Sequence, residues 1–114
     1  MKKFALSVFV SFAIATQLAA QQKNLQAPEG FDVIKNGIAH GKIDSLNYSS
    51  STVGTQRKVL VYTPPGYDKK KKYPVLYLLH GIGGDEKEWL REGTPQIILD
   101  NLYADKKVEP MIVV

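Results

Sequence analysis

Residues 73–84 read YPVLYLLHGIGG, an apolar run that passes directly into a glycine-rich turn. The run from Val75 to Leu79 contains no charged or amide side chain. Such a run is typical of a strand buried on both faces of a parallel sheet. Open α/β sheets bind ligands at the carboxyl ends of their strands, so the turn that begins at His80 is the first candidate site.

The segment before this run predicts an antiparallel hairpin at the edge of a larger sheet. Extended structure is expected for residues 43–48 and 57–63, and in the second stretch Val59 and Val61 alternate with their neighbours. Residues 49–54 are turn-like. A loop must follow, because the consecutive prolines in TPPGY at 63–67 remove two backbone donors that a central strand requires.

Four lysines at 69–72 continue that loop. A lysine run is most simply explained as a solvated surface turn. The sequence disfavours the alternative, a site for polyanions, because it shows no aromatic or second basic cluster beside the run.

A helix is predicted after the glycine-rich turn, with Thr94 as N-cap, Pro95 as first helical residue and an end near Ala104. Ile98 and Leu102 share one face of it.

Residues 111–114 then open a further apolar strand. The pattern predicts an α/β fold with a mostly parallel central sheet. An apolar strand at the last residue leaves an uncovered edge, which favours a truncated sheet over a naturally short protein that ends in a strand.

Residues 1–20 resemble a secretion signal: Lys2 and Lys3 precede an apolar centre, and small residues end it before Gln21. The apolar stretch is shorter than the roughly 20 residues that span a bilayer, so no stable membrane span is expected after cleavage. An uncleaved anchor or a buried helix is the alternative. We expect a linker at 21–36, a domain at 37–114, and a secreted or periplasmic location.

The charge and the amino-acid composition argue against nucleic-acid binding and against functions that need cysteine. Removing the signal takes away two lysines and lowers the formal charge from +4 to +2, which gives little support for nucleic-acid binding. The sequence contains no cysteine, so disulfides, thiolate chemistry and a lipidated amino-terminal Cys are excluded.

Together these segments resemble the esterase D and feruloyl-esterase-like branch of the α/β-hydrolases, from about residue 30 to 114. The resemblance is carried by VYTPPGY at 61–67, YPVLYLLHGIGG at 73–84, Trp89, the DNL stretch at 100–102 and PMIVV at 110–114. It implies the N-terminal part of a secreted serine esterase, acting on feruloyl or acetyl esters of plant polysaccharide.

The resemblance also implies roles within the turn. The backbone amide of Ile82, with Gly83 as second choice, is expected to bind the oxyanion. His80, Gly81 and Gly84 are expected to shape the turn, and Trp89 is a candidate pocket wall, although a large aromatic is more often part of the core. No serine has the Gly-x-Ser-x-Gly setting of a nucleophile, and His80 comes too early in the chain to be the base, so the triad is absent from this sequence.

Other interpretations are weaker. Glu86 stands where a dinucleotide motif needs its third glycine, and no phosphate-loop Gly-Lys-Ser or Gly-Lys-Thr occurs. No metal or other cofactor is expected, because the spacing of the histidines and acids, His40, His80, Asp85, Glu86 and Glu88, matches no zinc or calcium loop. Solvation on a surface loop explains the three acids. A non-catalytic truncated product or a carbohydrate-associated binding piece is the alternative to an enzyme fragment.

Overall fold

A computed structural model describes residues 26–114, so the predicted signal segment lies outside the described residues. The elements are β1 (Lys42–Ser50), β2 (Thr55–Thr63), β3 (Val75–Leu76), α2 (Glu88–Glu92), α3 (Pro95–Ala104) and β4 (Ile112–Val113). The strands form one sheet in the order β1-β2-β4-β3. β2 is antiparallel to both of its neighbours, whereas β3 and β4 are parallel.

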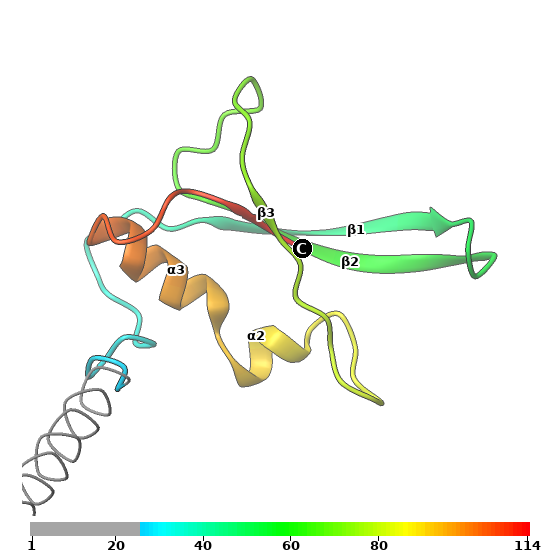
Figure 1. Cartoon of the computed structure of the whole chain (residues 1–114), viewed down its shortest axis with the longest axis horizontal. Coiled ribbons are helices and arrows are strands. Elements are labelled where there is room, and N and C mark those ends of the chain that lie inside the picture. Colours follow the sequence, from blue (N-terminus) through cyan, green and yellow to red (C-terminus); the bar gives the residue numbers. More distant parts are fainter. Residues whose placement is uncertain (1–25) are drawn as a thin grey trace, which may run out of the picture.

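The predicted hairpin is confirmed and lies at one edge of the sheet (Figure 1). Its register runs from the pair Lys42 and Thr63 to the pair Ser50 and Thr55. The turn closes where the Gly54 N–H donates to the Ser50 carbonyl at 2.9 Å. Gly54 has a φ of 67°, a conformation that glycine adopts without steric cost.

The expectation that residues 75–79 are buried on both faces is wrong. Only Val75 and Leu76 form a strand, with exposed fractions of 44% and 41%, and Leu79 is 83% exposed. β3 is the last strand in the order, so β4 pairs with one of its edges and no described strand pairs with the other. A bond of 2.8 Å from the Leu78 N–H to the Val114 carbonyl continues the pairing beyond β3.

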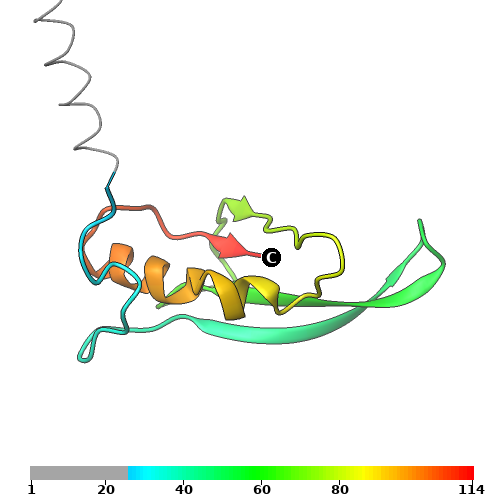
Figure 2. The same ribbon diagram turned by 90° about the horizontal axis from the view of Figure 1, so that it is seen from below.

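Both helices lie on the same side of the sheet, where α2 and α3 follow each other in one row (Figures 1 and 2). α3 has the predicted bounds, but Thr94 makes no side-chain cap and has a φ of 42°. Its backbone carbonyl instead accepts from the Ile97 N–H at 3.0 Å. The short helix α2 was not predicted.

A small core joins the sheet to α3. Its buried apolar members are Tyr62, Leu99 and Val113. Partly buried side chains pack around them, namely Ile43, Leu78, Tyr103 and Met111. Leu99 packs against the sheet, so the buried face of α3 is centred on Leu99, next to the face that Ile98 and Leu102 share.

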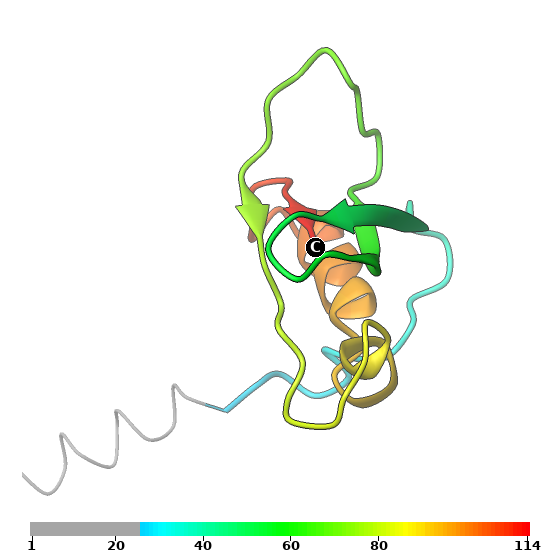
Figure 3. The ribbon, with the colours of Figure 1, turned by 90° about the vertical axis from the view of Figure 1, so that its right-hand side faces the viewer.

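Two loops leave the sheet in opposite directions. The segment between β2 and β3 rises on the side away from the helices, and the segment between β3 and α2 descends on the helix side (Figures 1 and 3). The second contains the glycine-rich turn. Among residues 26–114, none of the helices is long and apolar enough to cross a membrane.

Candidate functional site

The glycine-rich turn leaves the sheet just after β3. It closes where the Gly84 N–H donates to the Gly81 carbonyl at 3.1 Å, and Gly83 takes a φ of +79°, which favours glycine. Ile82 is fully exposed at the tip. Within residues 26–114 the amides of Ile82 and Gly83 donate to no protein acceptor, so both are free for a ligand.

The helix α2 holds this turn through two side chains. Glu88 Oε1 accepts from the Gly81 N–H at 3.0 Å, and the Trp89 indole Nε1 donates to the Leu79 carbonyl at 3.0 Å. The Glu88 carboxylate occupies the space that a Cβ on Gly84 would need. The two free amides therefore lie on a segment fixed at both ends.

His80 faces its own turn, because its Nδ1 lies 2.8 Å from the Gly81 carbonyl. This contact places the ring against the backbone that the resemblance expects it to shape. It leaves Nε2 as the ring nitrogen directed away from that bond.

Asp85 begins α2. Its Oδ1 accepts from the Lys87 N–H at 2.9 Å and from the Arg91 guanidinium at 2.9 Å, while its carbonyl accepts from the Glu88 N–H. The backbone bond from Lys87 and, next, the bond from Arg91 lower the pKa of the Asp85 carboxyl. Asp85 is exposed and Glu88 partly exposed, and each also makes a specific bond to the turn or to α2.

One hollow adjoins the glycine-rich turn, and a second is lined by residues of the sheet and of both helices. An open polar one of about 520 Å³ lies between the hairpin and the turn. It is lined by Tyr48, Arg57 and Lys58 from the hairpin and by His80, Gly84, Asp85 and Glu86. A smaller one of about 50 Å³ lies between the sheet and the helices, with Trp89, Leu78 and Leu99 in its wall. Ile82 and Gly83 line neither hollow.

A second polar cluster, which sequence reasoning missed, joins the hairpin to α3. The buried Asp100 accepts from the Tyr62 hydroxyl at 2.6 Å and from the Gly41 N–H at 2.9 Å, and its other oxygen lies 3.0 Å from His40 Nδ1. Burial, followed by the bond to Asp100, raises the pKa of Tyr62 above its ordinary value.

Asn101 beside it donates through Nδ2 to the carbonyls of Phe31 and Val33, at 2.8 and 2.9 Å. The adjacent polar pair inside the apolar sequence IILDNLY was the available signal for this cluster.

The described serines Ser45, Ser49, Ser50 and Ser51 all belong to the hairpin or its turn, and none has a hydrogen bond to a described histidine. Across residues 26–114, no three histidine or acidic side chains gather closely enough to hold a metal ion. The glycine-rich turn thus offers backbone donors without a nucleophile.

Comparison with known proteins identifies relatives of this arrangement. A family model described as "Putative esterase" matches residues 50–114. The chain is 40% identical over 91 residues to an endo-1,4-beta-xylanase/feruloyl esterase of Xylanibacter ruminicola, covering 75% of this chain and 12% of that protein. It is 36% identical over 75 residues to endo-1,4-beta-xylanase Y of Acetivibrio thermocellus, covering 65% of this chain and 7% of that protein.

Solved structures agree. The feruloyl esterase module from Clostridium thermocellum, as a serine-to-alanine mutant complexed with sinapinate, matches with a TM-score of 0.67 at 32% identity, over 76% of this chain and 30% of the module. A CE1 ferulic acid esterase from Anaeromyces mucronatus, in complex with ferulic acid, matches with a TM-score of 0.71 at 32% identity, over 76% and 32% of the two chains. The described sheet and helices therefore correspond to about a third of these folds.

Proposed function

We propose that this chain forms the N-terminal, oxyanion-binding part of a serine carboxylic-ester hydrolase. The chain belongs to the esterase family and shares the α/β-hydrolase fold of feruloyl esterases. The proposed substrates are feruloyl or acetyl esters of plant polysaccharide. Two relatives named as xylanases, one also as a feruloyl esterase, and a related structure holding ferulic acid support this substrate class.

One observation carries the proposal: the free amides of Ile82 and Gly83 on a braced turn. Attack of a serine oxygen on an ester carbonyl places negative charge on the carbonyl oxygen. Backbone N–H groups aimed at that oxygen stabilise the transition state more than the ground state, because the charge develops only there. Fixed donors also need no reorganisation during the reaction.

The nucleophilic serine, its acid and its histidine are not among the residues of this sequence. We therefore expect the exported chain to hydrolyse no p-nitrophenyl ester faster than a heat-denatured control of the same concentration. Clear turnover would contradict the assignment of the missing serine.

A chimera tests the turn directly. Residues 37–114 replace the matching part of the Clostridium thermocellum feruloyl esterase module, and hydrolysis of a feruloyl ester is measured. Ile82→Pro removes the amide proton, and we expect kcat to fall about 100- to 1000-fold, the usual cost of one lost oxyanion donor. Ile82→Val keeps the amide and should keep kcat. If both variants retain kcat, Ile82 does not bind the oxyanion, and Gly83 is tested next by an amide-to-ester backbone replacement.

We further propose that residues 1–20 direct the chain out of the cytoplasm and are removed before Gln21. Support comes from the charged start, the apolar centre and the small residues that end it. Mass spectrometry of the secreted or periplasmic product should show a chain beginning at Gln21. A full-length chain that stays in the cell would contradict this proposal.

A further inference from the structure

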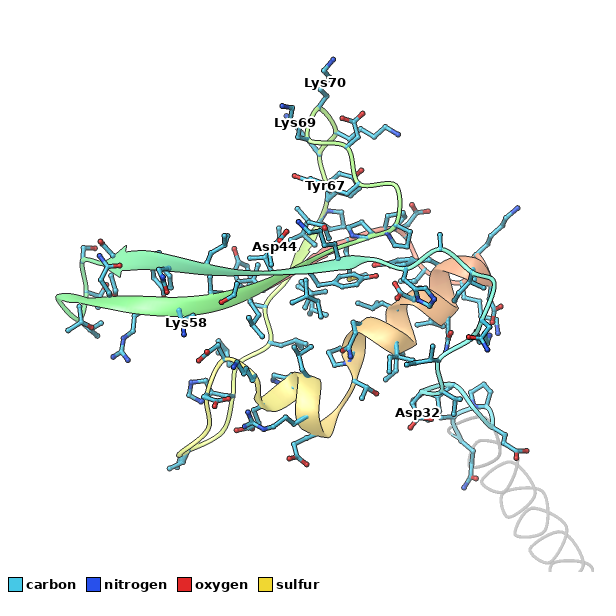
Figure 4. The ribbon with its side chains drawn as sticks, turned by 180° about the vertical axis from the view of Figure 1, so that it is seen from behind. Asp32, Asp44, Lys58, Tyr67, Lys69 and Lys70 are labelled. Carbon is cyan, nitrogen blue, oxygen red and sulfur yellow. The ribbon has the colours of Figure 1, made fainter. Side chains whose placement is uncertain are left out.

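The loop between β2 and β3 carries a concentrated positive charge. Lys69, Lys70, Lys71 and Lys72 are all exposed, and none makes an ion pair with any residue in the range 26–114. Figure 4 shows Lys69 and Lys70 at the outer end of this loop, pointing away from the sheet. We call residues 66–73 the lysine loop.

Internal bonds define the shape of the lysine loop. The Asp68 side chain accepts from the Lys70 N–H at 2.9 Å, and the Asp68 carbonyl accepts from the Lys71 N–H at 2.9 Å. The Asp68 N–H in turn donates to the Tyr73 hydroxyl at 3.0 Å. The four ammonium groups are thus presented from a folded turn and not from an extended, self-repelling segment.

Two aromatic rings form the base of the lysine loop. Tyr67 and Tyr73 lie with ring centroids 5.2 Å apart and a tilt of 36°, and Tyr67 remains 44% exposed. The sequence suggested no aromatic cluster beside the lysines, because these tyrosines stand six residues apart and meet only when the turn folds. The structure therefore supplies one of the two features, the aromatic cluster, whose absence from the sequence pattern disfavoured a polyanion site.

We propose that the lysine loop binds a polysaccharide that carries uronic acids. The ammonium groups pair with carboxylates along the polysaccharide, and the exposed face of Tyr67 packs against the C–H face of a sugar ring. This inference rests on the proposed function, because it names the acidic class of plant polysaccharide that this part of the esterase would hold. The site lies apart from the glycine-rich turn, on the opposite side of the sheet (Figure 3).

Other polyanions fit less well. A membrane surface would need apolar side chains at the tip, but residues 68–72 are all charged. A nucleic acid would need a longer basic stripe to follow its phosphates. A polysaccharide needs only a short contact with both charge and an aromatic face.

Binding of the full chain to polygalacturonate tests the inference, with fully methyl-esterified pectin as the uncharged probe. We expect binding to polygalacturonate but not to the methyl-esterified pectin, and weaker binding to polygalacturonate at 150 mM than at 10 mM salt, since salt screens exposed charges. The variant K69Q/K70Q/K71Q/K72Q should bind ~10-fold more weakly. The control R57Q/K58Q/K87Q/K106Q, which removes the same charge from residues outside the loop, should bind within about twofold of the parent protein. An equal loss in both variants would overturn the inference, because net charge and not the loop would then explain binding.

Tyr67→Ala separates a polysaccharide from other polyanions. It should weaken binding to polygalacturonate but leave binding to inorganic polyphosphate and to phosphatidylserine vesicles unchanged. Equal binding to all three probes, insensitive to Tyr67→Ala, would also overturn the inference. Neither outcome affects the Ile82 test, because the chimera is assayed with an uncharged ester. A failure of the lysine-loop proposal can therefore be distinguished from a failure of the proposed function.

Discussion

The hydroxyl group of Tyr62 donates a 2.6 Å hydrogen bond to Oδ1 of Asp100, which joins the hairpin to α3 in the interior of the protein. Both residues are almost fully buried. A buried carboxylate is costly unless donors surround it. Here the Gly41 N–H provides a second donor, and together these bonds fix how the helix sits on the sheet.

Removing the Tyr62 hydroxyl should therefore destabilise the protein. For Tyr62→Phe we expect the free energy of unfolding to fall by about 1.5–3 kcal/mol, the usual value of a hydrogen bond to a charged group. Urea denaturation measures the change. Tyr48→Phe, at a half-exposed hairpin position, is the matched control and should alter stability little. Equal stability of both variants would show that the bond contributes nothing net.

Stability should also decline at alkaline pH. Burial and the neighbouring Asp100 raise the pKa of Tyr62, and burial raises that of Tyr103. The folded protein thus keeps protons that the unfolded chain loses near pH ~10. The contribution of these tyrosines to stability is therefore complete below that pH and is lost as the pH rises further. Denaturation midpoints between pH 8 and 11 test this. Tyr62→Phe should give a shallower decline, and an unchanged slope would contradict the assignment.

Gly41 is predicted to reject any side chain. A Cβ at this position would overlap the Tyr62 ring and the Thr63 carbonyl. Overpacking of this kind costs about 1–3 kcal/mol, so Gly41→Ala should lower the melting temperature clearly. Gly81→Ala is the control, because its nearest neighbour, Glu88 Oε1, would lie at an ordinary 3.5 Å. A melting temperature for Gly41→Ala equal to that of the control would contradict the packing.

The single tryptophan of the chain reports on the glycine-rich turn. Asp85→Ala removes the acceptor of the bonds from the Lys87 N–H and the Arg91 guanidinium, and we expect Trp89 to lose its bond to Leu79, with a shift of its emission to longer wavelength. Glu86→Ala changes the neighbouring acid and should leave the emission unchanged.

Acid provides a second readout of the same contact. The bonds from Lys87 and Arg91 lower the pKa of Asp85. The stability that these bonds contribute is therefore present above pH ~4, the pKa of Asp85 in the unfolded chain, and is lost as the pH falls below that value. The parent protein should show the same emission shift on acidification. The Asp85→Ala variant should show a smaller one, and identical pH profiles would exclude Asp85 as the group responsible.

Local sequence predicted the local elements well. Alternation around Val59 and Val61 was enough for the hairpin, and Thr94 with Pro95 marked the start of α3, because these signals act over a few residues. The burial of residues 75–79 was not predictable in this way. Whether a strand has one neighbour or two depends on which distant segments pair with it, and β3 has only β4 among the described strands.

In the candidate site, too, local features could be predicted from the sequence and contacts between distant residues could not. The position of residues 80–84 beyond β3 followed from the apolar run and its glycines, although the strand itself ends at Leu76. The bonds that hold the turn did not, since Glu88 and Trp89 belong to a helix of five residues that is too short to show a periodic pattern. Likewise, Asp100 meets Gly41 across 59 positions of sequence.

The two hydrogen bonds that Asn101 donates limit how far the amino terminus of this protein can be shortened. One amide nitrogen satisfies both the Phe31 and the Val33 carbonyls, so a recombinant version that starts after Val33 would strand a buried donor inside α3. The last residues of the predicted linker are thus hydrogen-bonded to α3 and belong to the folded domain. Expression vectors should keep every codon from Phe31 onward.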